Sequence, residues 1–162
     1  EFGKQKINAL EEIIDETDDK IIIWANYIYN IEQVKEFLTS KYGKDSFVEI
    51  YGATKIKDRQ QAIESFQNDP KVRFFVSNPT TGGYGLTLTA ANTVVYFSNN
   101  YNLEVRKQSE DRAHRSGQKG TVVIIDIITQ NTIDEKIMKA LTKKGQIAAK
   151  TLGEEELKDW LL

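Results

Sequence analysis

Cysteine is absent from this sequence of 162 residues, and histidine occurs once, as His114. A chain without cysteine forms no disulfide scaffold, zinc ribbon or cysteine nucleophile, and one histidine excludes a histidine-rich site, so we expect the domain to bind no metal on its own. No apolar run approaches the roughly 18 residues of a membrane helix, and no signal peptide is recognisable. We therefore expect a soluble, cytoplasmic protein without a membrane partner. No repeat or Pro/Gly-rich linker divides residues 1–162, which predicts a single domain.

The net charge is also small, at −2, but it hides an uneven distribution. Residues 51–150 hold 15 basic and 9 acidic side chains, whereas the two ends together hold 7 and 15. A phosphate backbone interacts with charges within a Debye length of about 8–10 Å. The net charge of the whole chain argues against a nucleic-acid partner, but the basic middle of the chain is compatible with one. On these counts alone, ordinary scatter of surface charge explains the pattern equally well.

The spacing of apolar residues predicts strands that alternate with helices. The expected strands are 20–25, 47–51, 72–76, 93–97 and 122–128. The expected helices are 4–17, 31–43, 58–66, 104–115 and 133–152, with a helical tail at 153–162. This alternation is typical of an α/β three-layer sandwich with a mainly parallel central sheet. In such sheets, functional residues collect in the loops that follow the carboxyl ends of the strands.

The loop after the third expected strand is rich in glycine, with Gly82, Gly83 and Gly85 close together. Glycine lets the backbone adopt positive φ and approach a ligand closely, and successive backbone N–H groups can hold a phosphate. A tight turn between a strand and a helix has the same composition. No GxxxxGKS/T sequence occurs, so the loop is not a P-loop. A Rossmann cofactor site is excluded as well, because Asn26 and Tyr27, not a GxGxxG sequence, follow the first strand.

Two arginines follow the fourth expected strand. On the predicted helix, Arg112 and Arg115 share one face, and Gln108 lies one turn earlier on that face. Two guanidiniums and an amide directed the same way suit a chain of phosphates, because arginine offers planar, permanently charged donors. The alternative is a solvated helix whose acidic residues pair with these arginines. We expect His114 to face elsewhere, as a structural residue or a hydrogen-bond donor.

Taken in order, these segments resemble the C-terminal RecA-like lobe of superfamily 2 helicases, and most of all the Swi/Snf-type DNA-dependent ATPases of phages and bacteria. The matching segments are 21–25 (motif IV), 51–54 with 58–60, 82–92 (motif V), 108–118 (motif VI) and 132–136. The resemblance implies a RecA-like fold and an ATP-dependent DNA translocase or helicase. In that family, ATP with Mg2+ lies between two lobes, and the Walker A lysine and DExx acid belong to the N-terminal lobe, which this sequence lacks. We therefore expect one lobe of a two-lobe motor, which is inactive alone; the sequence leaves open whether it is part of a longer protein.

The resemblance also implies roles for individual residues. Arg112 and Arg115 are the implied arginine fingers, with Arg115 closer to the γ-phosphate. The implied nucleotide contacts are Gln108, Gly83, Gly85 and Asp111, and the implied nucleic-acid contacts are Thr54, Asn78, Thr81 and Thr89. The implied partners are double-stranded DNA, with RNA left open, and the N-terminal RecA-like lobe of the same protein. The implied location is the cytoplasm of a prokaryote or of a phage-infected cell.

A second hypothesis is a non-enzymatic nucleic-acid-binding or scaffold module that kept the fold. The intact set of Gln108, Arg112 and Arg115 argues against it, because such a module has no physical need for two arginines directed at a cleft. The sequence leaves open whether the motor unwinds the duplex or only translocates along it.

Overall fold

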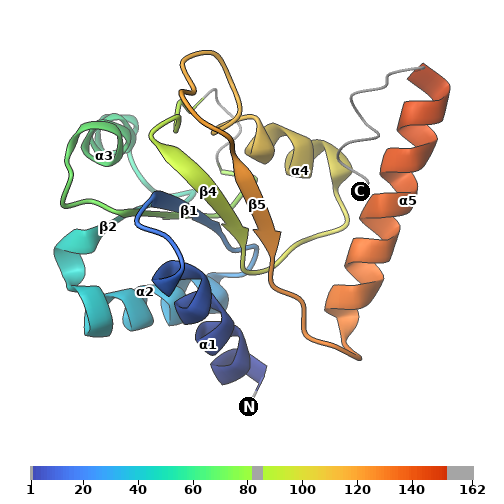
Figure 1. Ribbon diagram of the computed structural model, residues 1–162, viewed down its shortest axis with the longest axis horizontal. Coiled ribbons are helices and arrows are strands. Elements are labelled where there is room, and N and C mark those ends of the chain that lie inside the picture. The colour runs from blue at the N-terminus through green and yellow to red at the C-terminus, as the bar shows by residue number, and fades with distance from the viewer. Residues whose placement is uncertain (1, 82–85, 153–162) are drawn as a thin grey trace.

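In the computed structural model, which describes residues 2–81 and 86–152, short apolar runs form the five strands of one sheet (Figure 1). The strands are β1 (Lys20–Trp24), β2 (Phe47–Ile50), β3 (Phe74–Ser77), β4 (Ala91–Tyr96) and β5 (Val123–Asp126). Their order is β2-β3-β1-β4-β5, and every neighbouring pair is parallel. The parallel α/β architecture predicted from the sequence is therefore confirmed.

Helices cover both faces of the sheet (Figure 1). They are α1 (Phe2–Asp15), α2 (Ile28–Tyr42), α3 (Ile56–Asn68), α4 (Leu103–Glu110) and α5 (Ile133–Leu152), with a short 3-10 helix, η1 (Lys44–Ser46). The predicted end of α2 at Gly43 is confirmed. Gly43 adopts a φ of 91°, and its N–H donates to the Thr39 carbonyl at 3.1 Å. Glycine ends a helix in this way because it lacks the Cβ that makes positive φ costly.

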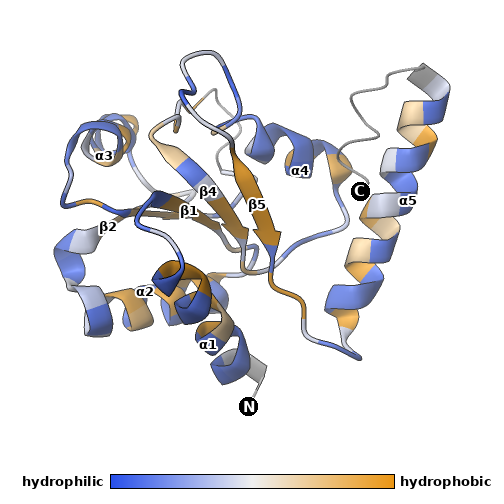
Figure 2. Cartoon of the chain, in the orientation of Figure 1, coloured by the Kyte–Doolittle hydropathy of each residue, from blue (hydrophilic) through white to orange (hydrophobic). Residues whose placement is uncertain are grey.

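Successive residues of β1 point to opposite faces of the sheet. Ile21 and Ile23 pack beneath α1 and α2, whereas Ile22 and Trp24 pack against α3. Burial on both faces is the reason that the strand is an almost continuous apolar run. Figure 2 shows the same layering, with hydrophobic residues in the strands and hydrophilic residues on the outer faces of the helices.

The helix predicted over 104–115 ends earlier, at Glu110, and turns follow it. Beyond α4, the N–H groups of Arg112 and His114 still bond to nearby carbonyls, those of Ser109 and Glu110, but a carbonyl of this segment bonds to a distant N–H. The Arg112 carbonyl, for example, accepts from the Leu88 N–H at 3.0 Å. Because a distant segment satisfies this group, the helical ladder is not needed there.

The most apolar strand lies at the border of the sheet. In the described structure β5 pairs with β4 alone, and its Val123 and Ile124 side chains are exposed. Composition gave no indication of this position, since a buried central strand has the same apolar character. The tail predicted at 153–162 lies outside the described residues. Within the described ranges, no helix is both long and apolar enough to cross a membrane.

Candidate functional site

An open depression of about 350 Å³ lies at the end of α4. Its lining residues are Gln108, Asp111, Arg112, His114 and Arg115. The structure thus brings together the two predicted arginine fingers and two of the predicted nucleotide contacts. Because α4 ends at Glu110, Arg112 and Arg115 lie in the turns that follow it. The prediction that they share one helix face with Gln108 is therefore wrong, although all three residues line the same depression. His114 was expected to face elsewhere, but it is exposed and lines the same depression.

Arg112 is the most unusual member of this group. Its side chain is only 8% exposed, and its Nε has no hydrogen-bond partner in the part of the chain that the structure describes. Burial, and then the positive charge of Arg115, lower the pKa of Arg112, and the carboxylate of Asp111 offsets them only in part. A buried cation with an unmet donor is costly, and Arg112 shares the depression with a second cation, Arg115. The electrostatics therefore suit a phosphate group.

Arg115 is more exposed than Arg112 and contacts the segment that precedes β4. Its Nη1 donates to the Leu86 carbonyl at 3.1 Å. The neighbouring Leu88 N–H binds the Arg112 carbonyl, so both arginines are connected to this segment. The other two predicted nucleotide contacts are Gly83 and Gly85. Both lie outside the described residues.

A buried ion cluster that sequence reasoning missed anchors α4 to the sheet. Arg106 binds Asp126 through two contacts, Nη1 to Oδ1 at 2.6 Å and Nη2 to Oδ2 at 2.9 Å, and its Nε binds Glu110 Oε1 at 2.6 Å. Its guanidinium carbon lies 3.5 Å from the centre of the Tyr96 ring. Burial opposes the charge of Arg106 most strongly, but the hydrogen bond and charge of Asp126, with Tyr96 and Glu110, outweigh it and raise the pKa of Arg106.

Two sequence signals could have revealed this cluster. Arg106 and Glu110 stand four residues apart, which places them on the same face of a helix. Asp126 is an acidic residue at the end of an otherwise apolar strand, and such a residue needs a partner.

The predicted nucleic-acid contacts lie at both ends of the strands. Thr54, Asn78 and Thr81 follow β2 and β3, at the carboxyl edge of the sheet, as expected for this fold. Thr89 instead precedes β4, at the amino edge, where Arg112 bonds to Leu88. The structure therefore places the two arginines near the amino edge, away from the carboxyl edge where the sequence predicts functional residues. β4 has six residues, so about 20 Å separates the two edges.

Asn78 is occupied within the fold. Its Nδ2 donates to the Asn26 carbonyl at 2.9 Å, and its Oδ1 accepts from the Thr80 N–H at 2.8 Å. Asn26 is bound in turn by Asn100 and Ser98. Asn78 therefore joins the loops of the carboxyl edge, which is a structural role whether or not DNA binds there.

Within residues 2–81 and 86–152, the hydroxyl groups of Thr54 and Thr89 accept hydrogen bonds and donate none. Thr54 Oγ1 accepts from the Tyr51 N–H at 3.1 Å, and Thr89 Oγ1 accepts from Gln67 Nε2 at 3.1 Å. A hydroxyl that accepts one hydrogen bond can still donate its hydrogen to a phosphate oxygen. The Thr81 side chain is partly buried, in the turn that begins at Asn78.

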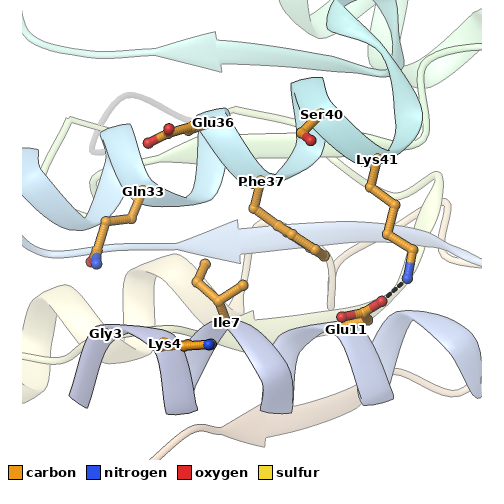
Figure 3. Close-up of a pocket in the computed structure, with 9 residues that line it drawn as sticks. All are labelled: Gly3, Lys4, Ile7, Glu11, Gln33, Glu36, Phe37, Ser40 and Lys41. Carbon is orange, nitrogen blue, oxygen red and sulfur yellow. Dashed lines mark ion pairs between the residues drawn. The ribbon is translucent and has the colours of Figure 1, made fainter. Parts of the chain in front are cut away.

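Four other depressions in the described part of the chain are lined by none of the predicted site residues. A depression of about 630 Å³ lies between α1 and α2, where Lys41 forms an ion pair with Glu11 (Figure 3). The described residues contain no group of three or more His, Cys, Asp or Glu that could hold a metal ion.

The parallel sheet covered on both faces, with paired arginines after α4, defines a RecA-like α/β lobe. Residues 5–117 match the family described as helicase conserved C-terminal domain, and the chain belongs to that family.

Comparison with individual proteins agrees with this assignment. The chain is 30% identical over 142 residues to the chromatin-remodeling ATPase INO80 of Sclerotinia sclerotiorum, across 88% of this chain and 8% of that protein. It is 31% identical over 148 residues to the protein of the same name in Lodderomyces elongisporus, across 91% of this chain and 9% of that protein. The structure matches the C-terminal part of the Fun30 ATPase domain with a TM-score of 0.78 and 31% identity, over 84% of this chain and 44% of the other.

The chain thus spans less than a tenth of the length of these curated relatives. Their names support the predicted resemblance to Swi/Snf-type ATPases. The phage and bacterial branch is not supported, because the organisms are fungi.

Proposed function

We propose that the chain is the C-terminal lobe of an ATP-dependent DNA translocase, in which Arg112 and Arg115 contact ATP held by the N-terminal lobe. The observation that carries this proposal is the buried Arg112, whose Nε lacks a partner among the described residues, beside Arg115 in an open depression. In phosphoryl transfer, an arginine near the γ-phosphate stabilises the charge of the transition state. Gln108 and Asp111 line the same depression and are proposed to order the nucleotide.

A phosphate in this depression would change the balance of charge around both arginines. It would offset the positive charge of Arg115 which, together with the larger effect of burial, lowers the pKa of Arg112. That gain exists only when the lobe carrying the nucleotide closes on this one, so bound ATP would favour the closed state and loss of the phosphate would favour opening. Mg2+ would come with the ATP, held by its phosphates and by the N-terminal lobe.

Double-stranded DNA is the proposed substrate, with RNA left open. The relatives are chromatin-remodeling ATPases, and residues 51–150 carry the basic excess of the chain. Thr54, Asn78, Thr81 and Thr89 are the proposed backbone contacts, and Gly83 and Gly85 would allow the intervening loop to approach the ligands. A chromatin substrate would place the protein in a nucleus and not in the cytoplasm predicted above.

The isolated chain should hydrolyse no ATP. A steady-state ATPase assay with duplex DNA should give the rate of the blank, because the Walker A lysine and the DExx acid are absent from the sequence. Mixing in a separately produced N-terminal lobe should restore turnover. Hydrolysis by the isolated chain would contradict the assignment of ATP binding to the other lobe.

Arg112→Met should stabilise the isolated chain while removing its response to polyphosphate. The change deletes a buried guanidinium with an unmet donor, and we expect about 1 kcal/mol of added stability. Inorganic tripolyphosphate should raise the melting temperature of the unchanged chain and not that of the variant. Lys143→Met, at an exposed position of α5, is the matched control and should keep the response. A variant that melts earlier, or that still responds, would contradict the proposal.

A further inference from the structure

Gln67, in the last turn of α3, bonds to a segment that lies far from it in the sequence. Its Nε2 donates to Thr89 Oγ1 at 3.1 Å, and its Oε1 accepts from the Ala90 N–H at 2.7 Å. The side chain is partly buried and does not line the depression that contains Arg112 and Arg115. Because the amide bonds through both of its polar atoms, once to a side chain and once to the main chain, it fixes the place and the orientation of this segment.

The segment that Gln67 holds also contacts both arginines. Between Leu86 and the start of β4 it forms neither helix nor strand, so no hydrogen-bond ladder fixes its main chain. The Leu88 N–H donates to the Arg112 carbonyl at 3.0 Å, and the Leu86 carbonyl accepts from Arg115 Nη1 at 3.1 Å. A displacement of the segment would therefore move both arginines.

The end of α3 that carries Gln67 is itself fixed to the sheet. Lys20 is the first residue of β1, and its Nζ donates to the carbonyls of Phe66, Asp69 and Val72, each at 2.7 Å or less. An ammonium group has three donors, and here they satisfy carbonyls at and beyond the end of the helix, where the helical ladder no longer does so. Phe66 is fully buried beside them. A continuous set of hydrogen bonds thus leads from the sheet, through the end of α3, to the segment before β4.

We propose that Gln67 is a positioning residue for ATP hydrolysis, which holds the segment before β4 so that Arg112 and Arg115 meet the phosphates of ATP. The inference rests on the function proposed above and adds to it a residue that lies outside the depression. Gln67 acts through the segment and not on the nucleotide. Groups that stabilise a transition state must be held to within about 0.5 Å, and a displacement of about 1 Å can cost about 10²-fold in rate.

The test measures steady-state ATP hydrolysis by the full-length protein at saturating duplex DNA. Gln67→Met keeps the length of the side chain but deletes both hydrogen bonds, so kcat should fall about tenfold or more while the KM for ATP changes less than about threefold. Gln67→Glu should restore most of the kcat, because a carboxylate can accept from the Ala90 N–H and from the Thr89 hydroxyl. Gln61→Met, at an exposed position of α3, is the matched control and should hydrolyse ATP normally.

A second measurement needs no turnover. In the isolated chain, Gln67→Met should reduce the rise in melting temperature that inorganic tripolyphosphate causes, and Gln61→Met should leave that rise unchanged. A contact that served stability alone would lower the melting temperature in the absence of phosphate and leave both the kcat and the response to tripolyphosphate as they are. That result would overturn the inference.

Two other outcomes would also overturn it, namely equal losses of kcat in Gln67→Met and Gln67→Glu, or an equal loss in Gln61→Met. If Gln67→Met does not fold, as judged by circular dichroism, Gln67→Asn replaces it with the same expectation, because the shorter amide cannot reach both partners. Failure of the motor function would appear separately, as hydrolysis that survives Arg115→Ala. Failure of this inference alone would appear as hydrolysis that is lost in Arg115→Ala and kept in Gln67→Met.

Discussion

Replacing Arg115 by alanine in the full-length protein should abolish DNA-stimulated ATP hydrolysis while largely sparing DNA binding. An arginine that reaches the γ-phosphate contributes about 10³–10⁵ in kcat, so residual turnover should approach the blank. Arg115 is exposed and bonds to the Leu86 carbonyl, so its loss should leave the core intact. Steady-state hydrolysis and duplex binding, measured on the same preparation, check both parts of this expectation.

Two further variants sharpen the Arg115 experiment. Arg115→Lys retains the charge but not the planar fork of donors, so we expect it to remain strongly impaired. Lys119→Ala removes an exposed cation from the same segment and should hydrolyse ATP normally. If Arg115→Ala retained turnover, the assignment of the arginine would be wrong. If the unchanged full-length protein bound DNA without hydrolysing ATP, the scaffold hypothesis would be correct instead.

Arg106→Met should lower the free energy of unfolding of the isolated chain by about 3–5 kcal/mol. Breaking a buried ion pair by removing one partner costs this much, because the remaining charge is left in a poorly solvated site. Here two carboxylates, Asp126 and Glu110, lose their shared cation at once. Urea unfolding followed by circular dichroism measures the effect.

The matched control for this change is Arg59→Met. Among the described residues, Arg59 donates to the backbone carbonyls of Thr54, Tyr51 and Gly52 near the surface, and its loss should cost about 1 kcal/mol. Combining Arg106→Met with Glu110→Gln and Asp126→Asn also removes the two carboxylate charges, and it should recover much of the lost free energy of unfolding. A single Arg106→Met variant as stable as its control would refute the role assigned to the cluster.

The sheet was predictable because its signals are local. The run from Lys20 to Trp24 is apolar enough to require burial on both faces, and Gly43 ends α2 for a reason that depends on one residue. The position of β5 at the border was not predictable, since an exposed apolar strand and a buried one have the same composition.

For the candidate site, the sequence predicted which residues lie together but not their burial or local structure. The spacing of Gln108, Arg112 and Arg115, together with the order of the surrounding segments, identified the residues that line one depression. Neither the burial of Arg112 nor the end of α4 could be read from spacing, because both depend on contacts with the chain around Leu88. The pairing of Arg106 with Asp126 is likewise a contact between residues far apart in the sequence.

The open side of β5 affects how the isolated chain behaves in solution. In the described structure this strand has one neighbour, so its outer row of N–H and C=O groups faces no other strand. With Val123 and Ile124 exposed beside it, such a row is a template for the edge of a second molecule. As concentration rises, the lobe should therefore associate through this strand. Measurements on dilute samples should describe the monomer, and those on concentrated samples should describe edge-to-edge oligomers.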